Sequence, residues 1–285
     1  MNFLTLLNPI SYAPSVASLC RLLFSRRLLL WEMGKRDIRD RYAGQSLGTY
    51  WAVLTPLLTM VVYLFIFVFV FRIRMPAVAD GVTQGWGGSY AMYLLSGLVP
   101  WLGFQEVMNR ATAAITGNAN LVKQVIFPLE ILPLKILWSA FLTQGVALII
   151  FLAYGTFRFG PPSTMLLLLP WLLFFQMLAS AGVALLLAAV APFFRDIKDV
   201  VGLLCFVLVF AMPIFFTRDM LPPEVYWLLL LNPLSHMIEC YHDILYWSAF
   251  VSPWSWLIFP AASVALFALG CRVFATLKTY FGNVL

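Results

Sequence analysis

Four side chains of the types that bind metals or transfer protons lie close together in the last third of the sequence. His236, Glu239 and Asp243 are spaced so that they would share one face of a helix, and His242 is adjacent to Asp243. Imidazole and carboxylate ligands of this kind suit a transition metal such as zinc. The spacings typical of strong metal motifs are absent, so a polar face turned to water, or a cap on a turn, is the simpler interpretation.

A second group of charged side chains could recognise phosphate. Residues 21–42 interleave basic residues with Leu, Ile and Trp. The guanidinium groups of Arg36, Arg39 and Arg41 suit phosphate because each can donate two parallel hydrogen bonds. We expect them to bind the diphosphate headgroup of a lipid or to dock a partner protein. Asp37 lies four residues before Arg41 on the same predicted helix, so these two side chains are expected to pair.

The sequence lacks the common catalytic motifs. Neither the P-loop pattern GxxxxGK[ST], which cradles nucleotide phosphates, nor the GxSxG turn of serine hydrolases occurs. A membrane-embedded glycosyl- or phosphotransferase would need an acidic cluster for Mg²⁺. Asp37 and Asp40 are the only candidates, and both have basic neighbours. We therefore expect no catalytic site, metal or cofactor in this chain.

The composition shows which solvent surrounds these residues. Of the 285 residues, 62% are apolar and only 11% are charged, whereas globular domains carry about 25% charged residues. A soluble protein must present a polar surface, and so few charged residues cannot form one. The sequence therefore predicts an all-α integral membrane protein. The net charge of +6 does not indicate nucleic-acid binding here, because Lys and Arg orient membrane spans.

Apolar stretches of about 20 residues predict membrane-spanning helices. We expect six spans, at about residues 48–71, 88–109, 134–157, 163–191, 200–217 and 254–275. Residues 218–250 are apolar but interrupted by prolines, and we expect a re-entrant helical hairpin there, with an amphipathic loop on the outer leaflet as the alternative. Residues 1–47 are then a cytoplasmic segment with an interfacial amphipathic helix, and residues 48–285 form the transmembrane domain.

The distribution of basic residues predicts the orientation. With the N-terminus inside, fourteen of the 18 Lys and Arg residues are cytoplasmic, and only Arg72, Arg74, Arg158 and Arg218 are outside. Such an excess is usual on the cytoplasmic side of membrane proteins, so both termini are expected in the cytoplasm. The predicted spans carry no ionisable residue at their centres, which argues against an ion-coupled carrier. The energy for transport would then come from another protein.

Aromatic residues make up 16% of the chain. The first and fifth predicted spans contain Trp51, Tyr63, Phe67, Phe206 and Phe210. Aromatic rings offer broad apolar faces on which the C–H faces of sugars can stack while the sugar hydroxyls stay hydrated. These residues are therefore candidates for the lining of a glycan pathway. The alternative is that they face lipid or the membrane interface, where aromatic residues are common.

Six segments of the sequence follow one another in a recognisable order. They are WEMGKRDIRDRYAGQSLGTYWAVLTPLL, LLSGLVPWLGFQEVMNRA, NANLVKQVIFPLEILPLK, FFRDIKDVVGLL, MPIFF and LLLNPLSHMIECYHDIL. In this order and spacing they resemble the type-2 ABC exporter permeases, and most closely the branch that exports lipid-linked O-antigen, teichoic acid or related glycans. The resemblance extends from about residue 30 to the C-terminus.

This resemblance implies a homodimer in the inner membrane, with two copies of a separate cytoplasmic ABC ATPase that binds ATP and Mg²⁺. It implies that the stretch Glu32–Arg41 contacts the ATPase, and that Asn118, Leu121, Lys123 and Phe127 belong to a coupling helix. It also implies a pore at the dimer seam lined by the first and fifth spans. The expected function is ATP-driven export of a lipid-linked polysaccharide, as in lipopolysaccharide biosynthesis.

Two other functions remain open from the sequence. A type-2 permease for small amphipathic drugs or lipids would share the architecture but would need no run of aromatic residues. A membrane-embedded glycosyl- or phosphotransferase would need an exposed acidic cluster near the inner interface. Stimulation of a co-purified ATPase by lipid-linked glycan or by drugs would separate these functions.

Overall fold

The computed structural model describes residues 12–73, 86, 89–124, 127–194 and 196–284, and within these ranges the regular elements are all helical. Residue 88, where the second span was expected to begin, lies outside the described residues. Arg74 and Arg195, which were counted in the orientation, lie outside them too. The statements below concern the described residues.

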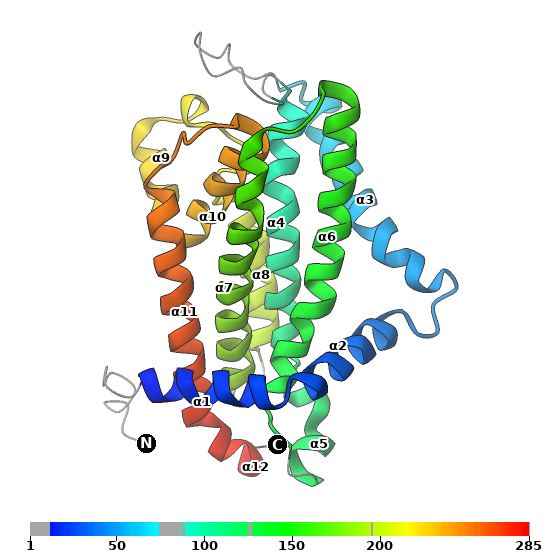
Figure 1. Cartoon of the computed structure of the whole chain (residues 1–285), viewed down its shortest axis with the longest axis vertical. Helices are drawn as coiled ribbons and strands as arrows, with labels where there is room; N and C mark the ends of the chain where they lie inside the picture. Colours follow the sequence, from blue (N-terminus) through cyan, green and yellow to red (C-terminus); the bar gives the residue numbers. More distant parts are fainter. Residues whose placement is uncertain (1–11, 74–85, 87–88, 125–126, 195, 285) are drawn as a thin grey trace.

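Long helices run along one axis of the molecule, and shorter helices lie at its two ends (Figure 1). The long elements are α3 (Trp51–Leu64) with the π-helical η4 (Phe65–Val70), α4 (Tyr90–Ala111), α6 (Ile131–Phe159), α7 (Leu169–Val190), α8 (Ile197–Phe210) and α11 (Ser255–Leu277). One end carries α1 (Tyr12–Ser25), α2 (Arg27–Tyr42), α5 (Ala119–Gln124) and α12 (Phe281–Val284). Nearer the other end are α9 (Pro223–Leu230), α10 (Pro233–His242) and the π-helical η8 (Asp243–Trp247). The short 3-10 turns are η3 (Gly48–Tyr50), η5 (Thr116–Asn118), η6 (Thr164–Leu168), η7 (Arg218–Met220) and η9 (Lys278–Tyr280).

Four helical stretches of the described chain are long and apolar enough to cross a bilayer. They are residues 51–70, 131–159, 164–190 and 255–280, which coincide with four of the six expected spans. At the other two expected positions lie α4, which is almost wholly buried among its neighbours, and α8. The 14 residues of α8 are fewer than the roughly 20 that a helix needs to span a bilayer.

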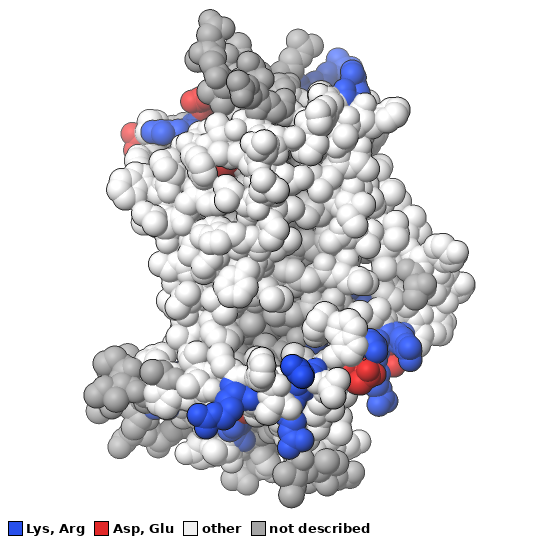
Figure 2. Space-filling model, in the orientation of Figure 1, with Lys and Arg blue, Asp and Glu red and all other residues white. Residues whose placement is uncertain are grey.

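The surface carries almost no charged residues in a broad band between two charged ends (Figure 2). Lys and Arg gather at the end that carries α1 and α2, which we call the basic end. Many large apolar side chains are exposed; Phe69 on η4 and Phe206 on α8, for example, are 69% and 65% exposed. So large an apolar surface is unfavourable in water. The band is therefore the region that faces lipid or another apolar surface, as expected of a membrane protein.

Two glycines set the distance between α7 and α11. A methyl group on Gly182 would lie 2.5 Å from the carbonyl carbon of Leu266, and Gly270 faces the backbone of Gly182. Small residues at such crossings let helix backbones approach each other, which matters in lipid because no hydrophobic force drives apolar helices together there. The close contact of α7 and α11 therefore depends on the absence of side chains at these two positions.

Polar side chains inside the bundle bond to one another. The amides of Gln144 on α6 and Gln176 on α7 exchange hydrogen bonds of 2.8 and 2.9 Å. The Tyr241 hydroxyl on α10 donates to Gln176, and Gln176 donates to the carbonyl oxygen of Pro100 on α4 at 3.0 Å. Both amides and the tyrosine are buried. These bonds connect four helices where no water is available to the polar groups.

Residues 218–250, where we expected a helical hairpin, contain two short helices that meet at Asn232. The Asn232 side chain accepts a hydrogen bond from the Leu234 N–H at 3.0 Å, and Pro233 occupies the first turn of α10. Both features are typical of a helix start. Most of α9 is exposed, whereas α10 is almost wholly buried and packs against α4 and α11. The region is therefore helical and anchored in the bundle by α10.

We expect Gly182→Ala to lower the melting temperature of the purified chain in detergent. The added methyl group forces α7 and α11 apart, and overpacking of this kind costs about 1–3 kcal/mol. Gly145→Ala on α6 is the matched control, because nothing lies within 4 Å of a methyl group at that position. The control should leave the melting temperature unchanged or raise it. Equal effects of the two substitutions would contradict the assigned role of Gly182.

Candidate functional site

Buried ionic contacts join α2 to the bundle at the basic end. Asp37 accepts hydrogen bonds from Arg110 on α4 at 2.7 Å and from Ser139 on α6 at 2.8 Å, and Arg41 pairs with Glu106 on α4. Asp37 is only 8% exposed. Charged groups so far removed from water are tolerated only when they are paired and hydrogen-bonded. These contacts therefore hold α2 against α4 and α6.

The spacing of the charged residues explains how this network forms. Asp37 and Arg41 on α2, and Glu106 and Arg110 on α4, are each four residues apart, so each pair occupies one face of its helix. The expected pair between Asp37 and Arg41 is wrong, because each side chain bonds to α4 instead. Arg110 also lies 3.5 Å from Glu106 on α4, so the four charged side chains form one network. Thr143 adds an acceptor for Arg41 at 3.2 Å.

Glu106 and Arg110 were not among the functional residues predicted from the sequence. Glu106 falls near the end of the expected span 88–109, and Arg110 follows it. An acid and a base four residues apart at such a boundary are the signal that could have revealed them, since such a pair has one charged face to offer to a neighbouring helix.

An aromatic contact adds to the attachment of α2. The rings of Trp31 on α2 and Trp138 on α6 meet edge to face, with their centroids 4.9 Å apart. Gly34 makes this approach possible, since a methyl group there would lie 2.6 Å from the Trp138 ring. The helix is thus fixed to the bundle along one side, while its other side carries exposed charges.

The three candidate phosphate-binding arginines differ in their accessibility. Arg41 is held in the network with Glu106 and is not free to bind a ligand. Arg36 and Arg39 are exposed, and Arg36 makes only a 3.4 Å ion pair with the equally exposed Asp40. Exposed pairs of this kind contribute little to stability, about 0.5 kcal/mol or less. Arg36 and Arg39 are therefore the two that can reach a headgroup or a partner protein.

Three of the four predicted coupling residues, Asn118, Leu121 and Lys123, lie on η5 and α5, which form a short helical protrusion at the basic end (Figure 1), whereas Phe127 lies after α5 and is not helical. Asn118 ends η5 and donates to the Ala114 carbonyl oxygen at 2.8 Å, which secures the turn before α5. Leu121 lies on α5 and is half-buried, and Phe127 packs against the hydrophobic core. Lys123 lies on α5 by its backbone, but its side chain is outside what the structure describes.

Three of the five pathway aromatics surround one buried ring. Phe67 stacks on Phe215 with the ring centroids 4.5 Å apart, and the rings of Tyr63 and Phe210 lie 5.7 and 5.3 Å from that of Phe215. Phe215 is 1% exposed and follows α8. The cluster therefore joins the helices of the first and fifth expected spans, with Phe215 as its centre.

The other two pathway aromatics lie outside this cluster core. Phe206 is exposed on α8 and contacts Phe210 at 5.7 Å between ring centroids. Trp51 lies at the start of α3, where it lines a hollow together with Gln45 and Arg41 near the basic end. It does not belong to the cluster around Phe215. The structure thus brings four of the five residues into one continuous aromatic surface. Phe215, the centre of the cluster, was not among the candidates predicted from the sequence.

The two acidic residues of the possible metal cluster are fully occupied by hydrogen bonds. Glu239 accepts from the hydroxyls of Tyr226 at 2.8 Å and Ser252 at 2.9 Å. Asp243 accepts from the Trp256 indole at 2.8 Å and from the backbone N–H of Ser252 at 3.3 Å. These bonds fasten α9, the segment before α11 and the first turn of α11 to α10 and η8.

The two histidines have separate partners. His236 meets the Ser255 hydroxyl at 2.9 Å, and burial lowers its pKa, so the ring is neutral near pH 7. His242 lies between the Ser96 hydroxyl and the Pro213 carbonyl oxygen, each at 2.8 Å. In the described chain, no three His, Cys, Asp or Glu side chains are arranged to hold a metal ion. The water-facing alternative is wrong, since all four residues are buried.

We expect the Arg41–Glu106 contact to show a coupling energy of about 1–3 kcal/mol in a double-mutant cycle of alanine variants, because both partners are largely removed from water. The unfolding of the purified chain in detergent is the measurement. The exposed Arg36–Asp40 pair on the same helix is the control, with an expected coupling of about 0.5 kcal/mol or less. Equal coupling energies for the two pairs would contradict the assigned role of the network.

Comparison with known proteins identifies the family. Residues 29–246 match the family described as ABC-2 type transporter. The chain is 26% identical to an "O-antigen export system permease protein RfbA" of Klebsiella pneumoniae, over 90% of this chain and 95% of the relative. It is 26% identical to the protein of the same name from Myxococcus xanthus, over 93% and 98% of the two chains. It is 27% identical to the "Polysialic acid transport protein KpsM" of Escherichia coli, over 72% and 76%. The chain belongs to the ABC-2 type transporter family.

Proposed function

We propose that the chain is the membrane-spanning subunit of an ATP-driven exporter that moves a lipid-linked polysaccharide across the inner membrane. The observation that carries this proposal is the alignment of 90% or more of the chain with permeases named for O-antigen export. The sequence contains no P-loop, so nucleotide hydrolysis belongs to a separate ATPase with its own ATP and Mg²⁺. The chain acts as a permease and not as an enzyme.

In this proposal the basic end faces the cytoplasm. The gathering of Lys and Arg at that end supports this orientation. The six spans are α3 with η4, α4, α6, α7, α8 continued through residues 211–217, and α11. The helices α9 and α10 form a re-entrant pair at the outer end, where buried partners satisfy the polar groups of α10. Both termini are then cytoplasmic.

Two copies of the chain would form the conduit. Only 11% of the most apolar stretch in residues 51–70 is buried within one chain, and α8 also exposes apolar side chains along most of its length. A two-fold axis beside α3 and α8 would bring two aromatic surfaces together, one from each copy. Sugar rings could pass such a surface by successive stacking contacts without being held tightly.

A cytoplasmic ATPase would act on this conduit through the basic end. The α5 protrusion offers it a point of contact, and two copies would serve the dimer. The exposed side of α2 offers a second contact. Because Asp37 and Arg41 fasten α2 to α4 and α6, a displacement of α2 would move these helices with it. Arg36 and Arg39 on the exposed side would collect the diphosphate of the carrier lipid.

We expect the double variant Arg36→Ala, Arg39→Ala to reduce polysaccharide export by about tenfold or more in vesicles that contain the partner ATPase. The reason is that two guanidinium groups able to bind phosphate are lost. Lys35→Ala is the control, since Lys35 lies on the same helix and is paired with Glu32 at 3.0 Å. Unchanged export and unchanged ATPase binding in the double variant would remove the role assigned to these arginines.

The dimer seam can be tested by cross-linking. In a Cys20→Ser background, we expect Phe206→Cys on α8 to link two copies of the chain through thiol reagents of graded length. Leu142→Cys on α6 should give no such link, although Leu142 is exposed on the apolar surface. Cross-linking at Leu142 in preference to Phe206 would place the dimer seam at α6 and would contradict a seam beside α3 and α8.

A further inference from the structure

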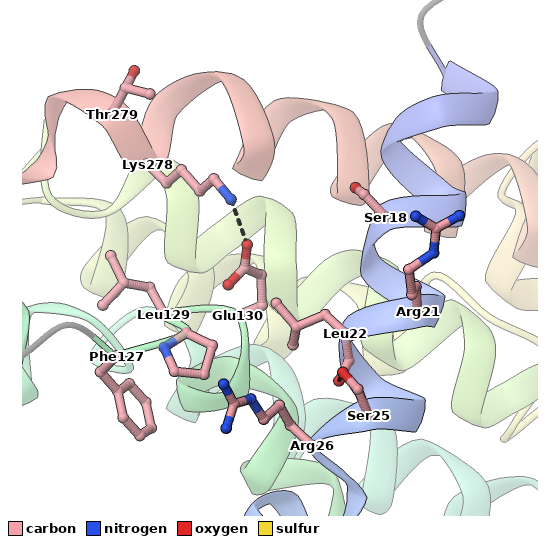
Figure 3. A pocket seen from close by; sticks show the side chains of 11 residues that line it. Ser18, Arg21, Leu22, Ser25, Arg26, Phe127, Leu129, Glu130, Lys278 and Thr279 are labelled. Atoms are coloured by element: carbon pink, nitrogen blue, oxygen red, sulfur yellow. Dashed lines mark hydrogen bonds and ion pairs between the residues drawn. The ribbon is translucent and has the colours of Figure 1, made fainter.

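A cavity opens at the basic end between three parts of the chain that are distant in sequence (Figure 3). Its volume is about 740 Å³. One wall is α1 with the residue that follows it, the second is the segment of residues 127–130 before α6, and the third is η9 after α11. This cavity is separate from the network that holds α2 and was not expected from the sequence.

The cavity carries two basic side chains without acidic partners. Arg21 and Arg26 line it, and neither makes an ion pair with a described residue. The other two charges on its wall cancel, because Lys278 pairs with Glu130 at 2.6 Å. The net charge of the cavity wall is therefore positive and belongs to the two arginines, which favours an anionic occupant.

The hydroxyl groups on the wall are already engaged. Ser18 and Ser25 donate to backbone carbonyl oxygens of their own helix at 2.8 and 3.1 Å. Figure 3 shows the guanidinium group of Arg26 directed toward Phe127 across the cavity, whereas that of Arg21 extends along α1 beside Ser18. Arg26 is thus the donor that faces the cavity, and guanidinium geometry matches the oxygens of phosphate.

The remaining walls and the position of α1 point to an amphiphile. Leu22, Phe127 and Leu129 give the cavity apolar surface beside the arginines. On either side of Arg26, Phe24 and Leu28 are 76% and 75% exposed. Large apolar side chains exposed on a basic helix are typical of a helix lying in the membrane interface. The cavity therefore opens at the depth of lipid headgroups.

We propose that this cavity binds the phosphate group of an anionic membrane phospholipid, held by Arg26, with Arg21 adding positive charge to the same wall and the apolar walls against the start of the lipid chains. The bound headgroup bridges α1 and residues 127–130. Since residue 127 lies three positions after the end of α5, the lipid fixes the segment by which the proposed ATPase contact connects to α6. The site is distinct from Arg36 and Arg39 and does not depend on which substrate is exported.

The test measures lipid retained by the purified full-length chain. The chain is incubated with equal amounts of phosphatidylglycerol and phosphatidylcholine, and bound lipid is counted by native mass spectrometry. We expect selective retention of phosphatidylglycerol, because the choline of phosphatidylcholine cancels its phosphate charge. The double variant Arg21→Gln, Arg26→Gln should retain about tenfold less phosphatidylglycerol, with an unchanged melting temperature.

Arg27→Gln is the matched control. Arg27 follows Arg26 directly, but its guanidinium group lies over the Phe24 ring, 5.5 Å from the centroid, and does not line the cavity. It should retain phosphatidylglycerol within about twofold of the native chain, whereas an equal loss in this variant would show general charge attraction and overturn the site.

Two further outcomes would also overturn the proposal. Displacement of phosphatidylglycerol from the native chain by millimolar inorganic phosphate would identify the ligand as a free anion. Loss of ATPase binding in the double variant, with lipid retention unchanged, would identify it as an acidic segment of a protein partner. Because the assay needs neither transport nor the ATPase for its main result, it can fail while the proposed export function stands.

Discussion

A bilayer supplies no hydrogen-bond partners, and this constraint explains where the polar side chains of this chain lie. Most of the described backbone between the two ends is helical, so its N–H and C=O groups bond within each helix. In the bend after α8, the carbonyl oxygens of Phe215 and Phe216 accept hydrogen bonds from the hydroxyls of Tyr90 and Tyr93 instead. The side chains of Gln144 and Gln176 bond to each other, and Tyr241 completes their set. At the outer end, Glu239 and Asp243 use their oxygens to fasten neighbouring segments. These polar groups inside the bundle thus become connections between helices.

The same constraint explains why α2 is held firmly against the bundle at the basic end. A charged pair at the edge of the bilayer is costly to break, because a lone charge would remain in a half-buried site. Asp37 and Arg41 therefore make α2 a rigid part of the bundle, although its outer side is charged enough to meet water or a partner. A force applied to this outer side passes directly to α4 and α6. Such a connection suits a subunit whose energy comes from another protein.

The sequence was sufficient to predict the features that depend on local composition. The apolar runs predicted the positions of the four helices that can cross a bilayer, and the prolines around Asn232 predicted short helices there. The missing P-loop separated the chain from the ATPases. Basic residues also predicted a helix at the membrane interface, although the structure divides it at Arg26 into α1 and α2.

Contacts between distant residues could not be predicted in this way. The partners of Asp37 lie 73 and 102 positions along the chain, so the intrahelical partner at Arg41 was the natural choice from spacing alone. Burial of His236 and Glu239 likewise depends on how α10 packs against α4 and α11. The cavity beside Arg21 and Arg26 depends on three chain segments that no local pattern connects. These features follow from packing, which decides which charges are removed from water.

The central claim is that this chain is a conduit driven by a separate ATPase. The most direct measurement reconstitutes the chain in vesicles alone, the ATPase alone, and the two together, and follows both ATP hydrolysis and the appearance of lipid-linked polysaccharide on the far side of the membrane. The account predicts that the chain alone neither hydrolyses ATP nor moves polysaccharide, and that the pair moves it only with ATP. Hydrolysis by the chain alone, or transfer that needs no ATPase, would contradict it.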